Sequence, residues 1–311
     1  MPSPVNGEPN LKQDDLLVVG CVRNEMLRLP WFLTHHRALG VQKFLLIDNG
    51  SDDGTRNFLL GQPDVCVFHT AERYSESRCG VSWLNSVLRD YAVGHWALVL
   101  DADELFIFPG FETLGLQQFV GYLETSGHDA VLAPMLDMYS RSPLAETGYR
   151  SGTSMLKTCP YFDGEGYEFY RPFPDRPKQL HRGGPRHRLF WKDHDRSFPS
   201  PVLGKIPLIK WKETYELEAS THILRGANTA STTGLLLHFK FLQDFIPNAH
   251  CEAQRKEHFR DARQYVAYDD VLTSTPGFSA FWEGSVRFED SAQMLGLGFM
   301  SLSDDYPFPV K

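Results

Sequence analysis

Short apolar runs alternate with amphipathic segments over the first 110 residues of the chain. Four of the runs are strand-sized and rich in aliphatic side chains, at residues 16–22, 44–47, 65–68 and 96–100. Runs of this kind are typical of strands that are buried on both faces of a sheet. A helix is predicted between Pro30 and Gly40, and a second over about 80–92, where apolar residues recur at helical spacing. This alternation predicts an open α/β sheet whose strands are mostly parallel.

The pattern is less regular beyond Pro109. Further strands are predicted at 130–136 and 235–239, and a charged helix over about 247–268. The segment 161–211 is dense in Pro, Gly, Arg and His and is interpreted as loops over one face of the sheet. We therefore expect a flexible N-terminal segment, an α/β domain, and a C-terminal helix and tail packed on that domain, with bounds at 1–15, 16–245 and 246–311.

Composition excludes several classes of protein. Hydrophobic residues make up 42% and charged residues 23%, so global disorder is not expected, and the net charge of −8 disfavours a nucleic-acid partner. The five cysteines are scattered and include no Cys-x-x-Cys pair, which argues against a disulfide framework or a structural zinc site and favours a reducing cytoplasm. No apolar run approaches the roughly 18–20 residues of a membrane span. We expect a cytoplasmic protein without a transmembrane segment, and peripheral membrane association stays open.

Polar residues follow three of the predicted strands directly. The clusters are Arg23-Asn24-Glu25, Asp48-Asn49-Gly50-Ser51 and Asp101-Ala102-Asp103-Glu104. In open α/β sheets, ligands bind outside the carboxyl ends of the strands. Each cluster is weak evidence alone, but the three together predict a binding site at one edge of the sheet.

The third cluster is a candidate metal site. Asp101 and Asp103 supply two hard oxygen ligands for Mn²⁺ or Mg²⁺, and such a cation would neutralise the oxygens of a diphosphate. The alternative is a pair of aspartates that cap a helix N-terminus. A second Asp-x-Asp, Asp193 to Asp195, follows no strand and is interpreted as a solvated loop. Asp48 is expected to accept hydrogen bonds from a nucleobase or ribose, or else to stabilise its own turn.

Basic and imidazole side chains lie later in the chain. The segment 171–196 has a net charge of +5 and is suited either to binding a diphosphate or acidic acceptor, or to forming a solvated loop. Its basic residues are Arg171, Arg176, Lys178, Arg182, Arg186, Arg188, Lys192 and Arg196. His222 and His238 lie among apolar or small residues, where a histidine is either a core residue or a metal ligand.

The motifs resemble those of family 2-like glycosyltransferases of the GT-A fold, and more narrowly a bacterial subgroup that opens with Val-Arg-Asn-Glu, here Val22–Glu25. The match is closest over about 16–110, through Leu46–Thr55 and Leu98–Glu104. The resemblance implies a Rossmann-like, mostly parallel sheet flanked by helices, with a C-terminal helical extension. It implies a UDP- or GDP-sugar donor, a glycan or other hydroxyl acceptor, and a role in bacterial surface polysaccharide synthesis.

The resemblance also implies roles for individual residues. Asp101 and Asp103 would bind the metal, with His238 completing the site and His222 as second choice. The expected donor-binding residues are Cys21, Val22, Arg23, Glu25, Asp48, Asn49, Arg78, Asp101, Ala102, Arg186 and Arg188. Asn49 departs from the acidic residue usual at that position, and the Gln-x-x-Arg-Trp motif of processive synthases is absent.

An inverting displacement is the mechanism that the resemblance implies, with a carboxylate as general base. Asp137 leads because it follows a predicted strand, and Asp163 and Glu165 are the other candidates. Two alternatives stay open: a nucleotidyltransferase, although the loop after the first strand lacks the glycines that grip a triphosphate, and a non-catalytic nucleotide- or carbohydrate-binding protein.

Overall fold

A computed structural model describes residues 1–171 and 179–310 of the protein. A seven-stranded sheet forms its centre. Its strands run in the order β1 (Ser3–Pro4), β4 (Val65–His69), β3 (Lys43–Asp48), β2 (Leu17–Val22), β5 (Trp96–Val99), β12 (Leu208–Lys210) and β7 (Ala130–Val131). The four consecutive strands β4, β3, β2 and β5 are parallel, and the strands outside them pair antiparallel. The predicted α/β architecture with a mostly parallel central sheet is confirmed.

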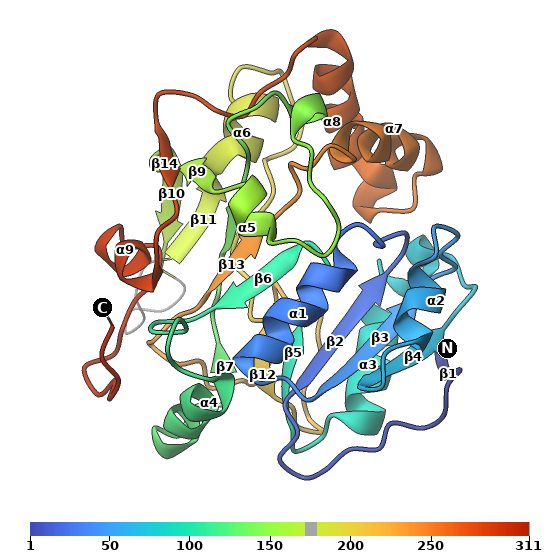
Figure 1. Ribbon diagram of the computed structural model, residues 1–311, viewed down its shortest axis with the longest axis vertical. Helices are drawn as coiled ribbons and strands as arrows, with labels where there is room; N and C mark the ends of the chain where they lie inside the picture. The colour runs from blue at the N-terminus through green and yellow to red at the C-terminus, as the bar shows by residue number, and fades with distance from the viewer. Residues whose placement is uncertain (172–178, 311) are drawn as a thin grey trace.

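Helices cover both faces of this sheet (Figure 1). Along β2, Val18 packs in one core with α1 (Leu29–Leu39), whereas its neighbour Val19 packs in the other with α3 (Val81–Tyr91). Successive side chains of a strand point to opposite faces of the sheet, so a continuous apolar run is buried on both faces. The chain leaves α1 at Gly40, whose φ of 102° is the left-handed conformation that glycine adopts without strain. Two further helices, α2 (Thr55–Leu60) and α4 (Leu116–Thr125), complete this region.

Gly20 allows the central strands to approach one another. A Cβ atom at this position would lie 2.5 Å from the backbone oxygen of Leu100, which is too close for any other residue without a backbone shift. The Leu100 N–H also donates to the backbone oxygen of Val19 at 3.1 Å. The ends of β2 and β5 are therefore held together where the first and third polar clusters begin.

A second, three-stranded sheet extends the acidic motif. It consists of β6 (Glu104–Ile107), β13 (Leu235–His238) and β8 (Met135–Asp137), with β13 in the middle. The register pairs His238 with Glu104 on one side and with Asp137 on the other. The single strand predicted at 130–136 is wrong: β7 and β8 belong to different sheets, and Pro134 between them cannot donate a ladder hydrogen bond.

The segment 161–211 contains more regular structure than the loops that we expected. It includes β9 (Tyr161–Asp163), β10 (Tyr167–Tyr170), β11 (Gln179–Gly183), α6 (Gly184–Phe190) and β12. The prediction failed because these elements are short and are stabilised by pairing with distant strands, which leaves little periodicity in the sequence. The structure places shorter helical turns at α5 (Met155–Thr158), η1 (Tyr74–Ser77) and η2 (Leu144–Glu146).

Two helices, α7 (Phe245–Arg255) and α8 (Phe259–Ser274), pack side by side at one end of the molecule (Figure 1). The chain then returns through β14 (Ser285–Arg287), which pairs with β9, and through α9 (Ser291–Gly296). At the other end of the chain, β1 pairs with β4, while the flexible segment 1–15 and the domain bounds stay predictions. Among the helices of residues 1–171 and 179–310, none combines the length and apolarity needed to cross a bilayer.

Candidate active site

The first two polar clusters meet at the carboxyl ends of β2 and β3. Val22 and Asp48 are partners across these parallel strands, so the loops that follow them leave the sheet side by side. Arg23 Nη1 donates to the backbone oxygen of Asn49 at 2.8 Å and joins the loops. The predicted grouping of these clusters at one sheet edge is therefore observed.

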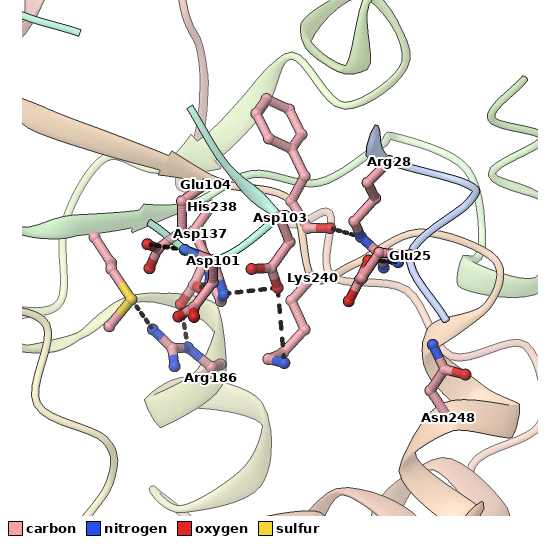
Figure 2. A network of polar contacts seen from close by, with 12 residues as sticks. Glu25, Arg28, Asp101, Asp103, Glu104, Asp137, Arg186, His238, Lys240 and Asn248 are labelled. Atoms are coloured by element: carbon pink, nitrogen blue, oxygen red, sulfur yellow. Dashed lines mark hydrogen bonds and ion pairs between the residues drawn. The ribbon is translucent and has the colours of Figure 1, made fainter. Parts of the chain in front are cut away.

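The acidic motif is the start of a chain of charged contacts across β6, β13 and β8 (Figure 2). Asp103 Oδ2 lies 3.1 Å from His238 Nε2. On the other side of the ring, His238 Nδ1 donates to Asp137 Oδ1 at 2.5 Å, and Arg186 Nε donates to Asp137 Oδ2 at 2.7 Å. Because His238 faces a carboxylate on each side, both of its nitrogens are held in place.

The pKa shifts of Asp103, His238 and Asp137 favour charges of alternating sign along this line of contacts. Burial alone would lower the pKa of His238, but the charge of Asp103 and the hydrogen bonds to Asp103 and Asp137 raise it. Burial likewise opposes ionisation of Asp103, yet His238 and Lys240 hold the pKa of that carboxyl well below its usual range. For Asp137, the charge of Arg186 and the bond from His238 outweigh burial and lower the pKa. The structure thus stabilises the ionised form of each carboxylate.

Lys205 contacts the acidic motif, and no pattern in the sequence indicated this. This lysine is buried, and its Nζ donates to Asp101 Oδ2 at 2.9 Å and to Glu104 Oε1 at 2.5 Å. Glu104 Oε2 in turn accepts from the Asp101 backbone N–H at 3.1 Å. The Asp101 side chain stays 57% exposed, so one face of its carboxylate remains open to solvent. No periodicity points to Lys205, because it lies in an irregular segment about one hundred residues after the motif.

Arg28 attaches the first cluster to the later strands and helices. It is buried, and it donates to both carboxylate oxygens of Asp244, at 2.7 and 2.9 Å. Its Nε donates to the Phe239 backbone oxygen at 3.3 Å, and the Phe239 N–H donates to the Asp103 backbone oxygen at 2.7 Å. A longer bond of 3.4 Å reaches Glu25 Oε2. The loop after β2, the acidic motif and the start of α7 are therefore one connected unit.

Lys240 adds a further cation beside the motif. Its Nζ lies 3.9 Å from Asp103 Oδ2 and over the rings of Phe245 and Tyr265. Burial opposes its charge, but the pKa of Lys240 is raised, with Tyr265 and Asp103 as the largest favourable neighbours. The sequence did contain an indication, because Lys240 follows the candidate ligand His238 by two positions on the same extended segment.

The side chain of Asp48 is occupied in this structure. It is fully buried, its Oδ1 accepts from the Ser51 N–H at 3.1 Å, and its Oδ2 accepts from Arg56 Nε at 2.7 Å. These contacts stabilise the turn. Asn49 Nδ2 donates to the backbone oxygens of Thr70 and Glu72. Donor binding by these two residues stays a prediction.

The other predicted donor residues vary in accessibility. Cys21 is half-buried, and its Sγ lies 3.9 Å from the Gly80 backbone oxygen. Val22 and Ala102 are buried side chains. Arg78 is exposed and contacts Glu216 at 3.3 Å. Donor binding at these positions stays a prediction.

Asp163 and Arg188 form a separate cluster. Arg188 donates to both oxygens of Asp163 at 2.9 Å, and Tyr139 and Trp282 donate to Oδ1 at 2.6 and 2.9 Å. Asp163 is buried, whereas Glu165 lies exposed in the turn between β9 and β10. In the described part of the chain, neither carboxylate forms a hydrogen bond or ion pair with Asp103 or His238, so the structure does not bring these candidates to the motif.

The remaining candidates lie as follows. His222 Nδ1 contacts the backbone oxygen of Gly204 at 2.7 Å, and burial lowers its pKa to about 4, as for a neutral histidine in a core. Asp193 and Asp195 are exposed. Two members of the basic segment, Arg176 and Lys178, lie outside the described residues.

A complete metal cage is not present in the part of the chain that the structure describes. No group of three or more His, Cys, Asp or Glu side chains there is arranged to hold a metal ion. Asp103 and His238 approach one another, but Asp101 is directed to Lys205. The metal stays a prediction.

Comparison with known proteins gives partial support for a glycosyltransferase relationship. No family model matches the chain. The chain is similar to a glycosyltransferase family 92 protein of Oryza sativa subsp. japonica, with 28% identity over 132 residues, which cover 38% of this chain and 21% of that protein. It thus spans about a fifth of the length of this curated relative. Assignment to family 2 stays a prediction.

Among solved structures, the chain is similar to 4-diphosphocytidyl-2C-methyl-D-erythritol synthase, at 18% identity. The likeness covers 47% of this chain and 70% of that chain, with a TM-score of 0.27. So low a score supports no conclusion about a shared fold or activity.

Proposed function

We propose that this protein is a metal-dependent glycosyltransferase that transfers the sugar of a nucleoside diphosphate sugar to a hydroxyl acceptor. The observation that supports this most directly is the chain Asp103–His238–Asp137, which lies at the sheet edge where the loops after β2 and β3 also meet. The sequence likeness to a glycosyltransferase supports the same activity.

Two side chains of this contact chain, Asp103 and His238, would be the first ligands of Mn²⁺ or Mg²⁺ in this proposal. Asp103 offers a carboxylate oxygen, and His238 offers Nε2, whose ring is held by the bond from Nδ1 to Asp137. A carboxylate behind a histidine is a common support for metal ligation because it fixes the orientation of the ring and raises its basicity. Asp101 would join from its exposed side. When bound, the cation would neutralise charge that develops on the diphosphate leaving group.

The surrounding residues have separable tasks in this proposal. Asp137 and Arg186 orient His238. Lys240, 17% exposed and 3.9 Å from Asp103, supplies positive charge toward the diphosphate. Arg23 and the backbone after β2 line the nucleoside side of the site. An inverting displacement and the UDP- or GDP-sugar donor are further parts of the proposal.

Asp103→Ala is the variant that tests this function. We expect UDP-glucose, UDP-galactose, UDP-N-acetylglucosamine or GDP-mannose to raise the melting temperature of the wild type only when Mn²⁺ or Mg²⁺ is present. We expect the active donor to be converted to free nucleoside diphosphate, and Asp103→Ala to abolish this conversion while circular dichroism remains unchanged. The matched control is Asp193→Ala, in the exposed second Asp-x-Asp.

The products separate the alternatives. A nucleotidyltransferase would release pyrophosphate from a nucleoside triphosphate, and a binding protein would show a melting shift without turnover. Turnover that persists in excess chelator would show that the metal assignment is wrong.

A further inference from the structure

A carboxylate that acts as general base must be free to accept a proton, and the carboxylates around the acidic motif differ sharply in this respect. Asp137 has both oxygens in short contacts, with His238 and Arg186, and only 1% of its side chain is exposed. Glu104 is fully buried, and both of its oxygens accept hydrogen bonds. Neither carboxylate has room for an acceptor hydroxyl.

Two further carboxylates are committed to other partners, Asp244 beside the motif and Asp163 away from it. Both carboxylate oxygens of Asp244 accept hydrogen bonds from Arg28, and its Oδ2 also accepts from Asn248 Nδ2 at 3.0 Å. Asp163 lies in its own cluster with Arg188 and is buried. Asp101 and Asp103 are the proposed metal ligands.

Glu25 is the carboxylate that remains. Its contact with Arg28 is long, at 3.4 Å, and involves Oε2 alone, while Oε1 forms no hydrogen bond or ion pair with the described residues. Its side chain is 26% exposed, compared with 1% for Asp137. In Figure 2, Glu25 and Asp137 lie on opposite sides of Asp103. The carboxylate of Glu25 can therefore be approached beside the proposed metal and diphosphate site.

The backbone of Glu25 is fixed, although its carboxylate is loosely held. The N–H donates to Thr55 Oγ1 at 2.9 Å, and the carbonyl oxygen accepts from the N–H groups of Arg28 and Leu29 at 3.0 Å. A side chain on such a support keeps its position relative to the motif while its terminal oxygens remain available. This is the combination that general-base catalysis requires.

The charges that face Glu25 place its pKa in the range where a base operates. Burial is the largest influence and raises the pKa. Asp103 of the motif and Asp244 at the start of α7 raise it further, whereas Arg28 before α1 and Lys240 after β13 lower it, with a result of about 8. A base is most effective when its pKa lies near the operating pH.

We propose that Glu25 is the general base of the sugar transfer, an assignment that rests on the function proposed above. The acceptor oxygen forms a bond to the anomeric carbon of the donor, and the bond from that carbon to the diphosphate oxygen breaks. The diphosphate leaves with the electron pair. The proton of the acceptor hydroxyl passes to the carboxylate of Glu25.

Glu25→Gln tests the assignment because the amide keeps the size of the side chain and cannot accept this proton. We expect kcat for transfer to a p-nitrophenyl glycoside acceptor to fall by roughly 10²- to 10⁴-fold, with Glu25→Asp retaining part of the activity. The Kd for the donor with Mn²⁺, measured by calorimetry, should change by less than about threefold, since the substitution removes a proton acceptor rather than a diphosphate contact.

The pH profile provides a second readout. The base acts in its ionised form, so kcat of the wild type should rise as the pH increases through the pKa of Glu25 in the complex. Glu25→Gln should lose this limb. Sodium azide needs no deprotonation, so it should restore turnover of Glu25→Gln and yield a glycosyl azide.

Outcomes separate this assignment from the proposed function. If the wild type transfers sugar and Glu25→Gln keeps more than half of the wild-type kcat, or loses donor binding in parallel with kcat, Glu25 is not the base. If the wild type turns over no donor, the proposed function itself fails, and the assignment of Glu25 fails with it. Glu213→Gln, at an exposed carboxylate outside the site, is the control and should keep wild-type kinetics.

Discussion

Lys205 shows how one buried charge organises the acidic motif. Its ammonium lies between Asp101 and Glu104 and is itself buried, so its own pKa is set by competition. Burial would lower the pKa of Lys205, but the two carboxylates raise it above its ordinary value. Glu104 is fully buried, whereas Asp101 reaches solvent. Glu104 therefore depends on Lys205 far more than Asp101 does.

Lys205→Met is expected to destabilise the protein by about 3–5 kcal/mol, the usual cost of leaving a buried charge without its partner. Glu104→Gln added to Lys205→Met should recover a large part of this loss, because the uncompensated carboxylate is then gone. Urea denaturation of the two single variants and the double variant measures the coupling. Lys157→Met, at an exposed lysine, is the control. An additive double variant would show that the Lys205–Glu104 contact contributes no stability.

The helix α1 illustrates how an element is attached to the site. His36 Nδ1 donates to the Phe32 backbone oxygen at 2.9 Å, and His36 Nε2 accepts from the Phe106 N–H at 3.4 Å. His35 Nε2 donates to the Phe106 backbone oxygen at 2.9 Å. A ring nitrogen that accepts a hydrogen bond carries no proton, so His36 is neutral in the fold. Through these contacts α1 is joined to β6, the strand that begins at Glu104.

Acid should destabilise the protein through this helix. Burial lowers the pKa of His35 to about 4 and that of His36 well below its ordinary value, which is about 6.5 in an unfolded chain. The unfolded state therefore binds more protons below about pH 6.5, and stability falls as the pH decreases from there toward 4. Each histidine contributes up to ~1.4 kcal/mol per pH unit. Urea denaturation at pH 7, 6 and 5 measures this slope.

His36→Gln is the variant that isolates the effect. It should reduce the pH dependence by about a third, since it removes one of the three histidines whose pKa values are lowered most, His35, His36 and His222, although its absolute stability is expected to be lower. His250→Gln changes an exposed histidine and should leave the slope close to that of the wild type. An unchanged slope in His36→Gln would assign the acid sensitivity to other groups.

In the molecule as a whole, the α7–α8 pair is connected to the N-terminal part of the chain at two places, Arg28 before α1 and the segment at η1. Asp244 at the start of α7 binds Arg28, beside the candidate active site. Glu257, between the two helices, accepts from the Ser75 N–H and hydroxyl at 3.0 and 2.6 Å and from Arg73 at 2.7 Å. The hydrogen bonds from Ser75, together with Arg73, lower the pKa of Glu257 to about 2. The helical pair and the segment at η1 are thereby held together.

Glu257→Gln should loosen this second connection selectively. Loss of charge-assisted hydrogen bonds is expected to cost about 1–3 kcal/mol, and hydrogen exchange should increase in residues 73–79 and 245–274. Exchange in β2 and β5 should not change, because these strands are held by the central sheet. Hydrogen exchange with mass spectrometry makes the comparison, with Glu213→Gln as control. Faster exchange throughout the chain would indicate a global effect rather than a local connection.

The central architecture, and the sheet edge at which the polar clusters meet, could be predicted from the sequence. Apolar runs predict β2, β3, β4 and β5 because strands buried on both faces leave a local pattern, and polar residues mark their carboxyl ends. The position of Asp103 after an apolar strand marks it as a candidate, and the resemblance to glycosyltransferases adds His238; the structure brings the two within 3.1 Å. The short strands of 161–211 were missed because their pairing partners lie far away in the chain.

Only the tertiary structure decided which charges meet. Lys205 lies 104 residues from Asp101 and Arg28 lies 216 residues from Asp244, and no periodicity relates such positions. These contacts depend on how β12, β13 and α7 pack against the sheet, and packing is a property of the whole core rather than of any segment. Arg186 and His238 likewise occupy both oxygens of Asp137, whereas Glu25 keeps a carboxylate that is loosely held. Asp137 was the leading candidate for general base because it follows a predicted strand, and these contacts are the reason that we propose Glu25 instead.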